Sequence, residues 1–172
     1  MKAYLKSKQA SWIWLVLRLY VGYQWLEAGW EKLTGPKPFD ASGFLKGAIA
    51  KATGEHPAVQ PWYAAFLKGF ALPNVGLFNF LIPWGEFLVG LALIAGFATL
   101  FAAFMGVFMN LNFMLAGSTS TNPILFTLGI FILIGGPYAG YLGVDYWFRP
   151  IWRSWMDRLT GKAAVATHAS GH

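Results

Sequence analysis

The sequence contains no cysteine among its 172 residues. This absence excludes disulfides, iron–sulfur clusters, thiolate metal sites and Cys-x-x-Cys redox chemistry in this chain. Charge is also scarce: charged residues make up 12% of the sequence, where soluble proteins carry about 25%. No Asp, Glu, Lys, Arg or His lies between Glu86 and Asp145. A soluble fold would need charged surface in so long a segment, so the sequence predicts an integral membrane protein.

Histidine is nearly as scarce, and His56, His168 and His172 all lie outside the long apolar segments. A haem ligated by two histidines inside a helical bundle is therefore excluded. The sequence has no glycine-rich phosphate loop, no dinucleotide fingerprint and no usable Ser/His/Asp arrangement. We therefore expect no haem, flavin, iron–sulfur or metal site in this chain. Any redox chemistry would need a diffusible cofactor such as quinone, or a partner protein.

The apolar segments predict an all-α fold, an integral membrane four-helix bundle. Its four spans are expected at approximately 11–33, 74–95, 97–117 and 123–144. They form one membrane domain over residues 1–160, followed by a disordered C-terminal tail at 161–172.

An amphipathic extracytoplasmic segment separates the first two predicted spans. Phe44, Leu45, Ala48 and Ile49 share one face of a short helix there, and Trp62, Phe66, Leu67 and Phe70 share a face of the next stretch. Two interpretations stay open: helices that lie flat on the outer leaflet, or an ordinary capping loop.

The basic residues at the two ends of the sequence predict the orientation. They are Lys2, Lys6 and Lys8 before the first span, and Arg149, Arg153, Arg158 and Lys162 after the last. An even number of spans places both groups on one side, which is cytoplasmic by the positive-inside rule. We therefore expect a multi-pass protein of the plasma membrane with cytoplasmic N- and C-termini. Because membrane topology explains these charges, we expect the lipid bilayer as a partner and no nucleic acid.

Two opposite charges are expected inside the spans. Arg18 lies about 10 Å from the cytoplasmic end of the first span and Glu86 about 13 Å from that of the second, at 1.5 Å per residue. Pairing lowers the cost of burying both charges, so we predict an Arg18–Glu86 ion pair. It would act either as a structural clasp or as part of a headgroup or proton site.

Helical spacing separates the faces of the first span. Small residues and cations share one side: Arg18, Gly22, Trp25, Gly29 and Lys32. Glu27 and Glu31 lie on the opposite side. We therefore expect the helix to be enclosed, or one side to meet a second protomer in a homo-oligomer. Gln24 and Asn110 are expected at one depth, where they could hydrogen-bond as packing contacts or line a ligand site.

Four motifs in order resemble the DoxX/DoxD family of membrane proteins. They are Arg18-Leu19-x-x-Gly22 with Glu27-Ala28-Gly29-x-x-Lys32-Leu33, Trp84-Gly85-Glu86-x-x-x-Gly90, Asn110-x-Asn112-x-Met114-x-x-Gly117, and Gly140-x-x-Gly143-x-Asp145-x-Trp147. The long segment after Lys32 is more similar to the DoxD type. The resemblance covers nearly the whole sequence.

The resemblance implies a subunit of a thiosulfate:quinone oxidoreductase, which passes electrons from thiosulfate or another small reductant to membrane quinone. In that function Arg18 and Glu86 are the candidate catalytic residues, and Tyr20, Gln24 and Asn110 the candidate quinone ligands. Lys32 and Lys37 would attract the thiosulfate dianion. If the enzyme needs a separate redox partner subunit, that subunit must come from another chain. The alternatives are a non-enzymatic scaffold or assembly subunit of a membrane redox complex, and a small oligomeric transporter.

Overall fold

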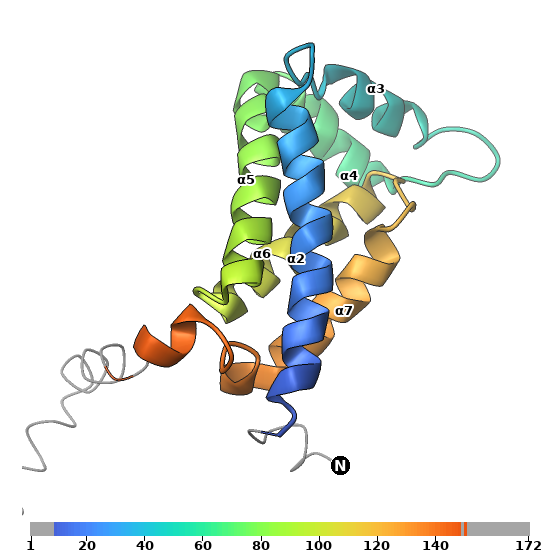
Figure 1. Cartoon of the computed structure of the whole chain (residues 1–172). Coiled ribbons are helices and arrows are strands. Elements are labelled where there is room, and N and C mark those ends of the chain that lie inside the picture. The colour runs from blue at the N-terminus through green and yellow to red at the C-terminus, as the bar shows by residue number, and fades with distance from the viewer. Residues whose placement is uncertain (1–8, 149, 151–172) are drawn as a thin grey trace, which may run out of the picture.

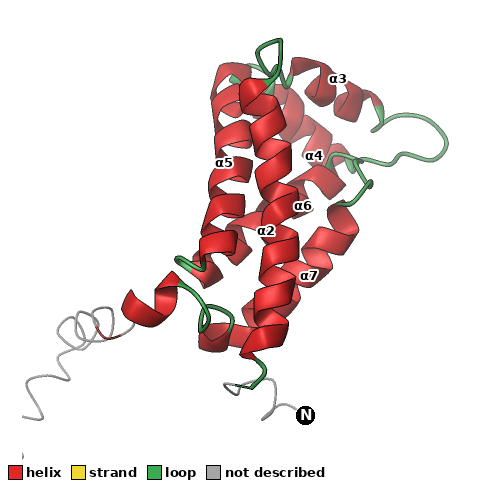
Figure 2. Cartoon of the chain, in the orientation of Figure 1, coloured by secondary structure: helices red, strands yellow, loops and turns green. Residues whose placement is uncertain are grey.

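The computed structural model describes residues 9–148 and 150, and this part of the chain is all-helical (Figure 2). The helices in order are α2 (Ser11–Thr34), α3 (Ser42–Ala50), α4 (Pro61–Phe66), the π-helix η1 (Leu67–Ala71), α5 (Val75–Ala95), α6 (Thr99–Leu115), α7 (Asn122–Gly135) and the 3₁₀-helix η2 (Gly136–Tyr138). The predicted all-α class is confirmed. The predictions for the basic residues at both ends and for the tail at 161–172 lie outside the described residues.

Helices α2, α5, α6 and α7 pack around a common core. Helix α2 contacts α5 and α7, and α6 contacts the same two helices. Helices α3 and α4 lie at one end of this arrangement, and the start of α2 and the end of α7 lie at the other (Figure 1). Trp14, Trp25, Leu93 and Ile132 are among the buried residues of the core.

Helices α2 and α5 approach so closely that their backbones touch at glycines. A Cβ atom on Gly29 would overlap the backbone of Phe87, and one on Gly90 would overlap the backbone of Leu26. Small residues at a helix interface allow this approach, as in many membrane proteins. Gly22 and Gly29, which helical spacing places on one side of the first predicted span, both face α5.

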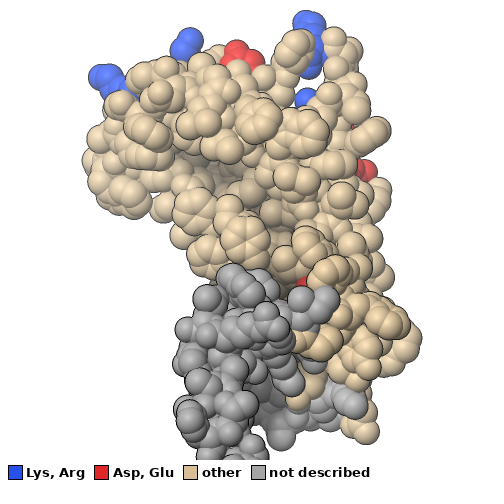
Figure 3. All heavy atoms as spheres, turned by 90° about the vertical axis from the view of Figure 1, so that its left-hand side faces the viewer, with Lys and Arg blue, Asp and Glu red and all other residues tan. Residues whose placement is uncertain are grey.

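One described helix has the length and composition of a membrane span. Helix α5 has 21 residues and a mean hydropathy of 1.8, while Thr99–Leu115 and Asn122–Tyr138 are apolar but shorter. Helix α2 is 24 residues long but carries four charged side chains. Figure 3 shows Lys and Arg gathered near the end formed by the α2–α5 connection, above a surface that is almost free of charge.

The last apolar helix is shorter than the predicted span at 123–144. Helix α7 ends at Gly135, and the backbone turns at Gly136, whose φ is 57°. Pro137 follows directly and has no N–H to continue the helical pattern. Residues 139–145 therefore turn back toward the α5–α6 connection, where the Asp145 N–H donates to the Gly96 carbonyl at 2.8 Å.

The segment between α2 and α5 is helical and packed. Leu45, Ala48, Tyr63 and Leu67 belong to a second buried cluster, which also takes up residues of α5 and α6. One face of α3 and α4 is therefore covered by the main helices, which favours the helical interpretation of this segment over a loose capping loop.

Candidate functional site

A polar cavity of about 380 Å³ opens between the main helices, at the end that carries α3. Its lining comes from α2, α3, α5, α6 and α7 together with the connections between helices. The polar members are Gln24, Glu27, Glu31, Lys32, Glu86, Ser118, Ser120, Thr121 and Asn122. Trp25, Phe44 and Phe113 are among its apolar members. Charged side chains of α2 and α5 converge in this cavity.

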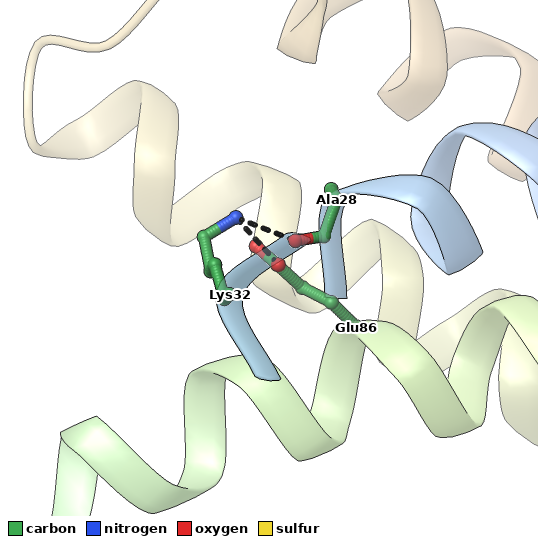
Figure 4. A network of polar contacts seen from close by, with 3 residues as sticks. All are labelled: Ala28, Lys32 and Glu86. Carbon is green, nitrogen blue, oxygen red and sulfur yellow. Dashed lines mark hydrogen bonds and ion pairs between the residues drawn. The ribbon is translucent and has the colours of Figure 1, made fainter. Parts of the chain in front are cut away.

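Lys32 and Glu86 form an ion pair in the wall of this cavity (Figure 4). The Lys32 Nζ lies 2.7 Å from the Glu86 Oε2 and donates a second hydrogen bond, of 3.2 Å, to the Ala28 carbonyl. The Glu86 side chain is only 3% exposed and that of Lys32 is 28% exposed. The pair therefore joins α2 to α5 and keeps a buried carboxylate compensated.

The predicted Arg18–Glu86 ion pair is wrong. Arg18 is 1% exposed, and its Nη1 and Nη2 donate to the carbonyls of Ala139 and Leu142 at 3.1 and 2.7 Å. The prediction took the cytoplasmic ends of the two helices as level. The first turns of α2 instead extend past the end of α5, and Trp14 packs against Gly135. Arg18 thus lies beside Gly96, and Glu86 is about 15 Å further along α5 at 1.5 Å per residue.

Asp145 completes a polar cluster around Arg18. Its Oδ1 accepts a hydrogen bond from the Ala98 N–H at 2.7 Å, and its Oδ2 one from the Thr99 N–H at 2.9 Å. Asp145 therefore caps the start of α6, a role that a local N-cap residue usually fills. Arg18 and Asp145 together tie the segment after α7 to α2 and α6, so Arg18 lies in a structural clasp at the end opposite the polar cavity.

The polar cavity carries an excess of negative charge. Glu27, Glu31 and Glu86 line it, and Lys32 is the only cation among its lining residues. The Tyr23 hydroxyl donates to Glu27 at 3.1 Å. Lys37, which the sequence paired with Lys32, is exposed and does not line this cavity. The cavity thus favours a neutral or positively charged ligand over an anion.

An apolar cavity of about 480 Å³ adjoins the polar one. Residues of α3, α4, η1, α5 and α6 line it, and aromatic and aliphatic side chains predominate. Phe44, Ile82 and Phe113 line both cavities and form the wall between them. Leu88 and Phe108 also line the apolar cavity and are about half exposed on the outer surfaces of α5 and α6. The cavity therefore reaches the surface between these two helices.

Tyr63 and Asn112 bring hydrogen-bonding groups to this apolar cavity. The Tyr63 hydroxyl lies 3.0 Å from the Asn112 Oδ1 and 3.1 Å from its backbone carbonyl. The Asn112 Nδ2 donates to the Phe108 carbonyl at 2.8 Å. Burial raises the pKa of the Tyr63 phenol above its ordinary value, so the hydroxyl keeps its proton. Tyr63 was not predicted as a site residue, because a single tyrosine in an amphipathic segment gives no signal of its own.

The three predicted quinone ligands are separated in the structure. Gln24 lines the polar cavity. Tyr20 is 48% exposed on the outside of α2 and lines neither cavity. Asn110 is fully buried, and its side-chain amide has no hydrogen-bond partner among the described residues. The hydrogen bond that Gln24 and Asn110 could have made is therefore not formed. No group of three or more His, Cys, Asp or Glu within the described part of the chain could hold a metal ion.

Comparison with known proteins identifies the family. The DoxX family model matches residues 13–119, which include most of α2, all of α5 and α6, and most of the residues that line the two cavities. None of the curated proteins and none of the solved structures compared with the chain matches it. The family and the apolar helix α5 together indicate a membrane protein. Since the match covers well over half of the sequence, the chain belongs to the DoxX family.

Proposed function

We propose that this DoxX-family protein is a membrane-embedded subunit that passes electrons from thiosulfate or another small reductant to membrane quinone. The observation that carries the proposal is the pair of adjoining cavities. One is apolar and reaches the surface between α5 and α6, and the other is polar and holds the Lys32–Glu86 pair. Phe44, Ile82 and Phe113 line both of them.

The apolar cavity fits a quinone in size and chemistry. Its volume of about 480 Å³ lies in the usual range for small-molecule sites, about 300–1,000 Å³. Phe44 and Phe113 meet edge to face, with ring centroids 6.2 Å apart, and give a quinone ring aromatic surfaces on which to pack. The exposed side chains of Leu88 and Phe108 at the outer surface would let an isoprenoid tail extend into lipid.

The polar cavity supports the delivery of protons to the bound quinone. Reduction of a quinone to a quinol takes two electrons and two protons, and the protons must reach an apolar site. Glu27 and Glu31 line the polar cavity, and Glu86 lies buried beside the shared wall. We assign Glu86 the role of holding and passing a proton toward the quinone site, and Lys32 that of keeping the buried carboxylate charged between transfers.

The charge of the polar cavity affects which reductant can enter it. Three carboxylates and one ammonium disfavour a dianion, and the Lys32 ammonium is already bound to Glu86. Thiosulfate is therefore expected to react outside this cavity, on a partner subunit that delivers electrons to the quinone. A neutral reductant could enter the cavity itself.

The arrangement supports four membrane crossings, by α2, α5, α6 and α7. Helices α2 and α6 run one way and α5 and α7 the other, so the start of α2 and the end of α7 share one end (Figure 1). We place that end in the cytoplasm of a plasma-membrane protein, because the sequence gathers basic residues before α2 and after α7. The 17 residues of α6 span about 26 Å, slightly less than a typical hydrocarbon core of about 30 Å, so the bilayer is expected to thin there.

The proposal is tested with the purified protein in nanodiscs, by thiosulfate-dependent reduction of a short-chain ubiquinone with and without co-purifying proteins. Glu86→Gln should bind the quinone normally and reduce it much more slowly, while Glu55→Gln, in an exposed loop, should match the wild type. Stable co-purification of a partner with no quinone binding would favour a scaffold instead. Solute flux into liposomes, with no redox activity, would favour a transporter.

A further inference from the structure

The lining of the apolar cavity is mostly apolar, but Tyr63 and Asn112 form a hydrogen-bonding corner in it. Tyr63 is 5% exposed and points its hydroxyl at Asn112, and both residues line the cavity. Trp84, the remaining lining residue with a polar hydrogen, is 41% exposed on the outer surface of α5. A ligand that enters the cavity therefore meets its buried hydrogen-bonding partner at Tyr63.

Aromatic rings surround this corner. The rings of Tyr63 and Phe66 lie 5.7 Å apart and are tilted by 37°, and Phe44 and Phe113 complete the lining nearby. Phe66 is followed at once by η1, whose Leu67 and Ala71 also line the cavity. Short π-helical segments occur often at functional sites. The corner thus offers flat apolar surfaces together with one hydroxyl, which suits the ring of a quinone or quinol rather than its tail.

The hydrogen bonds of Tyr63 decide which oxidation state the corner favours. A tyrosine hydroxyl has one hydrogen to donate and oxygen lone pairs to accept with. Its hydrogen is shared between the Oδ1 and the backbone carbonyl of Asn112, at 3.0 and 3.1 Å. The Asn112 Nδ2 donates one of its two hydrogens to the Phe108 carbonyl. Tyr63, whose single hydrogen is already bound, therefore presents lone pairs to the cavity, which complement a hydroxyl and offer no hydrogen to a carbonyl.

We propose that Tyr63, held by Asn112, is the positioning residue for the ring in the apolar cavity and makes the site bind the quinol form more tightly than the quinone form. The inference rests on the proposed function, because it takes the ligand to be a quinone. One hydrogen bond from the quinol hydroxyl to the Tyr63 Oη corresponds to a preference of about three- to tenfold. By linkage, a tenfold preference for the reduced form raises the two-electron midpoint potential of the bound couple by about 30 mV.

The experiment measures the affinities of a short-chain ubiquinone and of its quinol, together with the midpoint potential of the bound couple, in nanodiscs. The wild type should bind the quinol three- to tenfold more tightly. Tyr63→Phe keeps the ring and should bind both forms equally, with the potential returned to that of the free couple. Tyr146→Phe, an exposed tyrosine outside both cavities, should keep the wild-type preference.

Asn112→Leu provides a second test that does not remove the hydroxyl. The change takes away the side-chain acceptor and leaves only the backbone carbonyl at 3.1 Å to hold the Tyr63 hydrogen. The hydroxyl can then turn more easily to donate to a quinone carbonyl, so quinone affinity should rise and the quinol preference should fall. Equal binding of both forms by the wild type, or a preference that survives in Tyr63→Phe, overturns the inference and leaves the proposed function standing. Failure of the wild type to bind either form overturns both.

Discussion

The Lys32 Nζ lies 2.7 Å from the Glu86 Oε2, and this contact joins two helices at the wall of the polar cavity. The two residues are 54 positions apart in the sequence, and the contact depends on the antiparallel packing of α2 on α5. The pair has two consequences. It makes the burial of Glu86 tolerable, and it places a charged group next to the wall shared with the apolar cavity.

Breaking one side of this pair should cost more than removing both charges. Lys32→Met leaves Glu86 buried without its cation, and we expect a loss of about 3 kcal/mol in the free energy of unfolding. The double variant Lys32→Met/Glu86→Gln should recover much of that loss, because no uncompensated charge remains. Unfolding in mixed detergent micelles measures both values, and a double-mutant cycle gives the coupling. Additive losses would show that the two side chains do not act as a pair.

The contact between α2 and α5 should be intolerant of added methyl groups. A Cβ on Gly90 would overlap the backbone of Leu26, so Gly90→Ala must push the helices apart. We expect a loss of about 1–3 kcal/mol, as for overpacked cores. Gly76→Ala is the matched control on the same helix, because a Cβ there meets nothing within 4 Å. It should be neutral or slightly stabilising in the same unfolding assay. Similar effects of the two changes would contradict the close approach of these helices.

Asp145 should stabilise the start of α6 from a distance. Asp145→Ala removes both acceptors for the Ala98 and Thr99 N–H groups, and the expected loss is about 1–2 kcal/mol, as for helix caps. Hydrogen exchange should then be faster at the first turn of α6 and unchanged in α3. Unchanged protection at Thr99 would show that Asp145 does not cap this helix.

Asp40 should make the start of α3 sensitive to acid. The Ser42 hydroxyl and N–H donate to its carboxylate at 2.6 and 3.0 Å, and these bonds lower the pKa of Asp40. A carboxyl with a depressed folded-state pKa stabilises the fold above its unfolded pKa, about 3.9. That stabilisation is lost as the pH falls through the lower folded-state value. Unfolding midpoints measured from pH 6 downward should therefore fall less steeply in Asp40→Asn, and identical pH profiles would exclude this role.

Parts of this structure could be predicted from the sequence because they depend on one helix at a time. The spacing of Arg18, Gly22, Trp25 and Gly29 indicated the buried side of α2, since residues three or four apart share a helical face. The long uncharged segment after Glu86 indicated apolar helices. Where Gly136 and Pro137 end α7, the apolar pattern continues past the turn, so the pattern did not indicate where the regular helix ends.

The partners of buried polar groups could not be predicted in the same way. They depend on how far one helix slides along another. Arg18, the predicted partner of Glu86, lies about 21 Å along α2 from Lys32, the observed partner, at 1.5 Å per residue. Lys32 and Glu86 meet because the first turns of α2 extend past α5. The apolar cavity depends likewise on the tertiary position of α4, which carries Tyr63.

Occlusion of the apolar cavity tests the central claim most directly, that a quinone binds there. Gly85 lines this cavity, and a Cβ on it would meet only the flexible end of Met109, so Gly85→Leu should fill the space. Gly76→Leu adds the same side chain to the same helix where nothing lies within 4 Å. In nanodiscs, the wild type and Gly76→Leu should bind a short-chain ubiquinone equally, and Gly85→Leu should lose at least about tenfold in affinity, near 1.4 kcal/mol. Saturable binding that is unchanged in Gly85→Leu, or no saturable binding by the wild type, would contradict the claim.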